Sequence, residues 1–85
     1  MMVLASFHNR TQALQFSNQL KGMRVNVKII NTPREISTSC GLSIMFDIKS
    51  INKARVVINS SRFTSFIGFY IKKNNGRMYT YEKTN

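Results

Sequence analysis

The chain has 85 residues, of which 13 are Lys or Arg and 3 are Asp or Glu, so its formal net charge is +10. This length suits one small domain with a narrow margin of stability. No run of about 18 apolar residues occurs, which excludes a transmembrane span. The single cysteine excludes both an internal disulfide and a C-x-x-C dithiol. The N-terminal apolar run lacks the basic leader of a signal peptide, so we expect a cytoplasmic protein.

The first third of the chain predicts a strand followed by a helix. Residues 2–7 carry apolar side chains on both sides, as a covered central strand does. Asn9 is a typical helix N-cap with Gln12 at the capping-box spacing, and Gly22 is placed to be the C′ residue of a helix within residues 11–23. The residues expected on the core face of this helix are Ala13, Leu14, Phe16 and Leu20.

Two strands flank the segment 32–41. Residues 24–30 alternate strictly between apolar and polar, and Pro33 marks the end of this strand because proline cannot donate a ladder hydrogen bond. Residues 42–48 resume the alternation. The residues expected to face the core are Val25, Val27 and Ile29 in the first of these strands and Leu42, Ile44 and Phe46 in the second.

The rest of the chain predicts a helix and a hairpin. Ser50 can cap a helix over residues 51–59, and residues 63–73 have the composition of a strand. Asn75-Gly76 is typical of a type I′ turn, so residues 77–81 would form the returning strand, and the last four residues are expected to fray. The helix positions expected to face the core are Ile51, Ala54 and Ile58.

This order of elements predicts an α+β fold of the ferredoxin-like βαββαβ plan. In that plan two helices cover one face of an antiparallel sheet, and here a C-terminal hairpin strand would extend it. No repeat or low-complexity segment indicates a second domain, so residues 1–85 are expected to form one. Proteins of many functions share the plan, so it does not by itself predict an activity.

The most unusual segment is TPREISTSCG, residues 32–41, which holds the only proline, the only cysteine and one of the three acidic residues. It exceeds the about two to five residues of an ordinary hairpin loop, and long ordered loops in small domains are often functional. The hydroxyl residues 37–39 can shape a turn, and Gly41 lets another group approach the backbone. The loop could therefore present Cys40 beside amide hydrogens and Arg34.

Cys40 allows two interpretations. Cationic and dipolar neighbours lower the pKa of a cysteine, and the thiolate is the reactive species, so Cys40 could be a reactive thiol. Free cysteines are also among the most buried residue types, and no partner base is evident beside this one. The residues alone therefore favour a small buried side chain at the start of a strand.

The pattern T-P-R-x-x-S-x-S-C-G, with the strands and helix around it, resembles the family of small bacterial proteins named "putative selenium/sulfur carrier-like". The resemblance covers roughly residues 2–59. It implies that Cys40 holds sulfur or selenium as a persulfide or perselenide, without another cofactor, in a carrier that is not an enzyme and docks with an unidentified protein partner. The resemblance shifts the interpretation of Cys40 towards a functional thiol. The residues that would build its setting are Thr32, Pro33, Arg34, Ser37, Ser39 and Gly41.

The charge and the C-terminal segment support an alternative function, nucleic-acid binding in DNA repair, recombination or RNA metabolism. A net charge of +10 fits a polyanion partner as well as it fits a soluble protein with an ordinary basic surface. Nucleic-acid modules combine aromatic rings for stacking with cations for phosphates. The strands lack the RNA-recognition pattern, however, and such rings more often pack in a core. The residues that would bind nucleic acid are Lys72, Lys73, Arg77, Tyr79, Tyr81, Arg55 and Arg62.

The sequence offers little other chemistry. His8 is the only histidine, and it could serve as a base for Cys40 if the end of the first strand meets the start of the third. One Cys, one His and three scattered carboxylates do not predict a metal site, and no glycine-rich phosphate loop is present. The sequence predicts no particular oligomeric state.

Overall fold

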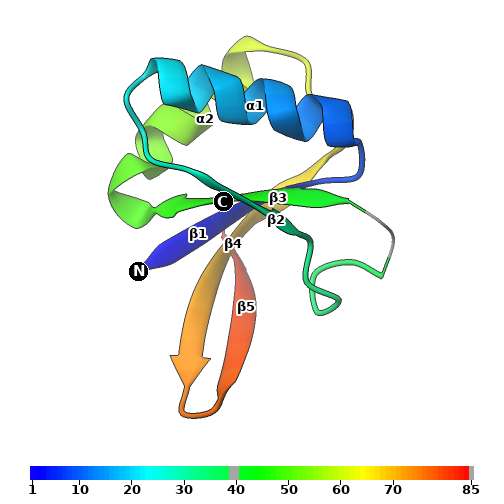
Figure 1. Cartoon of the computed structure of the whole chain (residues 1–85), viewed down its shortest axis with the longest axis vertical. Coiled ribbons are helices and arrows are strands. Elements are labelled where there is room, and N and C mark those ends of the chain that lie inside the picture. Colours follow the sequence, from blue (N-terminus) through cyan, green and yellow to red (C-terminus); the bar gives the residue numbers. More distant parts are fainter. Residues whose placement is uncertain (39–40, 85) are drawn as a thin grey trace.

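The computed structural model describes residues 1–38 and 41–84 and confirms the α+β class (Figure 1). Figure 1 shows two helices on one side of a five-stranded antiparallel sheet, whose strand order is β2-β3-β1-β4-β5. Within the described residues, no helix is long and apolar enough to cross a membrane. The elements are β1 (Met2–Phe7), α1 (Arg10–Gly22), β2 (Lys28–Asn31), β3 (Leu42–Asp47), a 3-10 turn (Ile48–Ser50), α2 (Ile51–Ser60), β4 (Phe66–Asn75) and β5 (Met78–Thr84).

β1 is the central strand and is buried on both faces, as its sequence predicts. Val3, Ala5 and Phe7 belong to the core under the helices, whereas Leu4 and Ser6 point to the opposite face. All five are fully buried. The core also takes in the predicted residues Ala13, Phe16 and Leu20 of α1 and Leu42, Ile44 and Phe46 of β3.

The N-terminus of α1 is capped as predicted, but Gln12 does not complete a capping box. The Asn9 side chain accepts a hydrogen bond from the Gln12 backbone N–H at 3.0 Å. The Gln12 side-chain oxygen instead accepts from the N–H and hydroxyl of Ser65, at 2.9 and 2.8 Å, and so ties α1 to the connection before β4. Leu14 is 41% exposed, and Ser17 takes its place on the buried face.

α1 ends in a left-handed residue, which is Arg24 and not Gly22. Arg24 has a φ of 63°. Its N–H donates to the carbonyl of Lys21 at 3.0 Å, and the N–H of Val25 donates to the carbonyl of Leu20 at 3.1 Å, which are the two bonds of a Schellman cap. Leu20 and Val25 are both core residues, so their burial sets the position of the cap and Arg24 takes the positive φ.

β2 is shorter than predicted. Val25 and Val27 pack against the core from the connection that precedes the strand, and the ladder begins at Lys28. Ile29 lies opposite Ile44 and thus on the helix side of the sheet. Ile29 therefore faces the side that its sequence predicts, but it is 41% exposed, because an edge strand has a neighbour on one side alone.

β4 and β5 form a hairpin that projects beyond the rest of the sheet (Figure 1). β1 pairs with β4 only as far as Lys72. The turn begins one residue later than predicted, because Asn75 still pairs in the ladder and Gly76 has the φ of 73° expected at the first position of a type II′ turn. β5 continues to Thr84, so the prediction that residues 82–84 fray is wrong.

The start of α2 also differs from the prediction. Ser50 makes no side-chain capping bond. Asp47 acts instead, because its carboxylate accepts from the Lys49 N–H at 2.9 Å and so caps the preceding 3-10 turn. Ala54 and Val57 are the buried residues of α2, and Ile51 and Ile58 pack partly against the core.

Candidate functional site

The motif loop, residues 32–41, connects β2 to β3 and is closed at its base. The N–H of Thr32 donates to the carbonyl of Gly41 at 3.1 Å. The loop thus leaves the sheet and returns to it at one point, as compact surface loops do. Ser39 and Cys40 lie outside the described residues, so the reactive thiol stays a prediction.

Pro33 begins a turn inside the motif loop. Its carbonyl accepts from the N–H of Ile36 at 3.0 Å and from the N–H of Ser37 at 3.1 Å. Arg34 and Glu35 occupy the two corner positions of this turn, and both are exposed. Because Arg34 and Glu35 are neighbouring corners of the turn, the positive and the negative side chain can extend towards different parts of the surface.

A chain of hydroxyl groups joins the motif loop to the sheet. Ser6 and Ser43 lie opposite each other in β1 and β3, on the face away from the helices, and both are fully buried. Their hydroxyl oxygens are 2.7 Å apart, and the Ser43 hydroxyl is 2.8 Å from that of Thr32. A buried polar group without a partner costs about 1–3 kcal/mol, so these bonds hold Thr32 against the sheet.

Gly41 is required by a close approach to β1. A Cβ atom at this position would lie 2.3 Å from the carbonyl oxygen of Phe7, which real structures do not tolerate. The Phe7 ring packs against the rings of Phe16, Phe63 and Phe66 at centroid distances of 5.2, 5.7 and 5.3 Å. β1 is therefore held in place, and the end of the motif loop passes next to it only without a side chain.

Glu35 acts on the sheet face that the helices leave uncovered. Burial raises the pKa of the Tyr81 hydroxyl, and the negative charges of Glu35 and then Tyr79 raise this pKa further. Tyr81 lies opposite Lys72, which lies opposite Met2, and these side chains point away from the helices. The motif loop therefore brings the Glu35 carboxylate near β5 on that face.

Arg10, at the start of α1, meets the motif loop at a pocket of about 360 Å³. The end of β1 pairs with the start of β3, and this pairing brings the start of α1 to the loop. Sequence reasoning applied this pairing to His8 but missed Arg10 and Asn31, and it named Thr38 only as a hydroxyl residue that can shape the turn. The motif pocket is lined by Arg10, Asn31, Thr32, Arg34, Ser37, Thr38 and Gly41.

His8 adjoins the end of the motif loop. Its backbone N–H donates to the carbonyl of Ser65 at 3.0 Å, and its Cα is 3.5 Å from where a side chain on Gly41 would begin. Because Cys40 lies outside the described residues, the role of His8 as a base stays a prediction. Among the residues that the structure describes, no group of three or more His, Cys, Asp or Glu could hold a metal ion.

The structure brings together part of the set predicted to bind nucleic acid. Lys72 and Tyr81 are directly opposite each other, and the Lys72 ammonium lies 4.1 Å from the centroid of the Tyr79 ring. Tyr70 and Lys83 form a further opposite pair on the same face, which sequence reasoning missed although their two-residue spacing along each strand predicts it. We call Tyr70, Lys72, Tyr79, Tyr81 and Lys83 the Tyr–Lys face.

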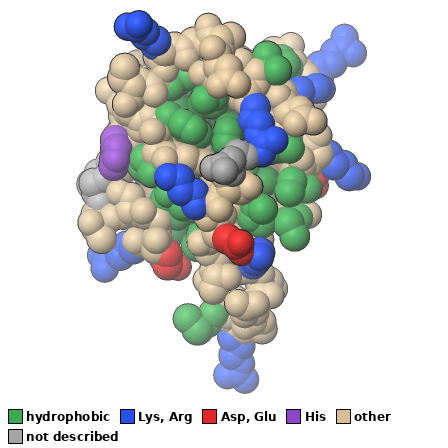
Figure 2. All heavy atoms as spheres, turned by 180° about the vertical axis from the view of Figure 1, so that it is seen from behind, with side chains coloured by type: hydrophobic (Ala, Val, Ile, Leu, Met, Phe, Trp, Pro, Cys, Tyr) green, Lys and Arg blue, Asp and Glu red, His purple; other side chains and the backbone are tan. Residues whose placement is uncertain are grey.

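The other members of that set lie elsewhere. Lys73 is on the opposite face of the hairpin in a salt bridge with Glu82. Arg77 is in the exposed hairpin turn, and Arg62 is exposed between α2 and β4. Figure 2 shows Lys and Arg side chains spread over the visible face, down to the tip of the hairpin. The structure therefore does not gather the predicted cations into one patch.

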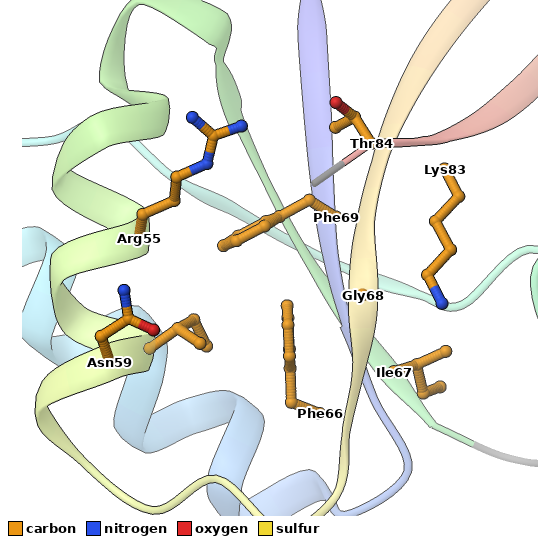
Figure 3. Close-up of a pocket in the computed structure, with 9 residues that line it drawn as sticks. Arg55, Asn59, Phe66, Ile67, Gly68, Phe69, Lys83 and Thr84 are labelled. Carbon is orange, nitrogen blue, oxygen red and sulfur yellow. The ribbon is translucent and has the colours of Figure 1, made fainter.

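Arg55 lines a second pocket, of about 400 Å³, between α2 and the start of β4 (Figure 3). The rings of Phe66 and Phe69 project into it from β4, and Asn59 contributes from α2. Lys83 lies on the other side of β4 from Arg55 (Figure 3). This pocket includes no described residue of the motif loop, so its lining does not bear on the predicted thiol chemistry.

The fold and the site define a small α+β protein with a closed polar loop that contains one cysteine. The chain belongs to the family described as "Putative Se/S carrier protein-like", which it matches over residues 2–66. The match spans β1 to the first residue of β4, includes the whole motif loop and leaves out most of the hairpin. No curated protein and no solved structure matches the chain.

We expect Gly41→Ala to lower the free energy of unfolding by about 1–3 kcal/mol, because the added methyl group would overlap the Phe7 carbonyl. Denaturant unfolding followed by circular dichroism measures this loss. Gly22→Ala is the matched control, since nothing lies within 4 Å of its added methyl group. Equal stabilities of the Gly41→Ala and wild-type proteins would show that the loop end does not pass so close to β1.

We expect Glu35→Gln to lower the pKa of Tyr81, because a negative neighbour disfavours the phenolate. The pKa stays above the ordinary tyrosine value, since burial, its largest cause, remains. Titration by NMR of tyrosine labelled at Cζ resolves the three tyrosines. Glu82→Gln removes a carboxylate bound to Lys73 on the opposite face and should change the Tyr81 pKa less. An unchanged pKa in Glu35→Gln would place the loop away from β5.

Proposed function

We propose that this protein is a thiol carrier that holds a sulfur or selenium atom on Cys40 as a persulfide or perselenide. The observation that carries the proposal is that motif residues 32–41 form a closed loop whose first and last residues, Thr32 and Gly41, are fixed against the sheet. Membership of the carrier-like family supports it. Such a loop suits a carrier because its two ends stay at a constant place on the sheet, where donor and acceptor proteins can dock in turn.

The transfer that we propose needs no added oxidant. The Cys40 thiolate attacks the terminal sulfur of a donor persulfide, so that an S–S bond forms at Cys40 while the S–S bond of the donor breaks and the donor leaves as a thiolate. A perselenide donor would pass on selenium in the same way. The positive charges of Arg10 and Arg34 in the motif pocket would favour the thiolate form of Cys40.

The proposal describes a carrier and not an enzyme, acting in the cytoplasm with a docked protein partner.

We also propose that the first four strands follow the ferredoxin-like plan. The position of β1 between β3 and β4 and the pairing of β2 with β3 support this. β5 then extends the sheet at the β4 edge.

We expect Cys40 to react with an alkylating agent with an apparent pKa well below the free value of about 8.5 in the folded protein, and at that free value in denaturant. The rate of iodoacetamide labelling against pH measures both. Arg34→Gln should raise the apparent pKa of Cys40, whereas Arg77→Gln, which removes the same charge at the hairpin turn, should not. Slower labelling in the folded state than in denaturant would make Cys40 a buried side chain and overturn the proposal.

A second candidate function is the binding of single-stranded nucleic acid. The Tyr–Lys face supports it, because it places all three tyrosines of the chain and two lysines on one face of the hairpin. Aromatic rings stack on bases while neighbouring cations neutralise phosphates, without reading the base sequence. All five residues of this face lie outside the family match, so it could serve a function that is separate from the carrier loop.

Adjacent lysines on opposite faces provide the test of this second function. We expect Lys72→Gln to reduce the slope of log K against log salt for a fluorescent oligothymidylate by about 0.7, the value for one phosphate of a single strand. Lys73→Gln removes the same charge from the other face and should leave the slope unchanged. Equal effects of the two changes, or a flat salt response, would contradict binding by the Tyr–Lys face.

A further inference from the structure

The motif pocket is lined by cations and polar groups. Arg10 and Arg34 contribute guanidinium groups, Asn31 an amide, and Thr32, Ser37 and Thr38 hydroxyls. No carboxylate is among the described residues that line it. Guanidinium and hydroxyl groups are the side chains that recognise phosphate and similar oxyanions, because arginine offers paired N–H donors in a planar fork.

The nearest acidic residue in sequence does not neutralise this pocket. Glu35 follows Arg34 directly, yet it is absent from the pocket lining and its charge acts on Tyr81 of β5. Within residues 1–38 and 41–84, neither Arg10 nor Arg34 forms a salt bridge with an acidic residue. Two arginine charges on one small pocket are therefore left for an external anion.

We propose that the motif pocket binds an oxyanion, with Arg10 and Arg34 holding its oxygens and the hydroxyl group of Thr38 adding a hydrogen bond. A volume of about 360 Å³ lies in the range of small-molecule sites, so the oxyanion fits free or as the head group of a small organic ligand. This inference goes beyond the thiol carrier, because the residues that bind the oxyanion do not include Cys40.

The test uses the Cys40→Ser protein, in which no thiol chemistry can contribute. Inorganic phosphate, selenite and glycerol 3-phosphate are each titrated at constant ionic strength while ¹H–¹⁵N NMR spectra are recorded. We expect saturable shifts confined to the residues of the motif pocket. Tighter binding of glycerol 3-phosphate than of phosphate assigns the site to a head group, and the reverse assigns it to a free ion. Absence of saturable shifts with all three probes overturns the proposal.

Matched arginine variants distinguish a specific oxyanion site in the motif pocket from the general attraction of a basic protein for anions. Arg34→Gln should weaken binding by at least about ten-fold, the effect of losing a charge-assisted hydrogen bond. Arg34→Lys keeps the charge but loses the planar fork, and should also weaken binding. Arg77→Gln should leave the affinity unchanged. Equal losses in Arg34→Gln and Arg77→Gln would overturn the proposal. Oxyanion binding in the Cys40→Ser protein stands even if Cys40 labelling shows a buried thiol, so the two proposals fail separately.

Discussion

The burial of β1 on both faces is the constraint on which the rest of the structure depends. Helices cover the face of Val3, Ala5 and Phe7, but the opposite face includes the hydroxyl of Ser6, which needs a partner once water is excluded. The hydroxyl chain from Ser6 through Ser43 provides that partner and ends on the first residue of the motif loop. The loop is thus anchored by the same strand that organises the core.

Local patterns in the sequence were sufficient for the strands and helices, and the errors arose where tertiary packing decided between local alternatives. Glycine at position 22 satisfies every local rule for a C′ residue, yet burial of Val25 moves the left-handed position to Arg24. Asn75-Gly76 is a strong turn signal, but the ladder extends through Asn75 and shifts the turn by one residue. Ser50 is a typical N-cap residue but makes no capping bond, and Asp47 caps the preceding 3-10 turn instead.

The site was predictable only as far as it lies within one segment. The rare residues of TPREISTSCG identified the motif loop, and the need for Gly41 follows from a contact with Phe7 that no spacing in the sequence reveals. Arg10 reaches the pocket because β1 pairs with β3. This depends on the register of the two strands, which the composition of the sequence does not reveal. The Tyr–Lys face likewise appears once Tyr70 and Lys83 are known to be opposite.

The positions of individual charged side chains say more about function than the total net charge does. Neighbouring residues place their charges on different surfaces. Lys72 lies on the same face of the hairpin as the tyrosines, whereas Lys73 binds Glu82 on the other face. In the motif loop, the turn that begins at Pro33 sends the Arg34 cation to the pocket while the Glu35 carboxylate acts on the sheet. If both charges faced the pocket they would neutralise each other, so the turn is what leaves a positive field beside the segment that contains the cysteine.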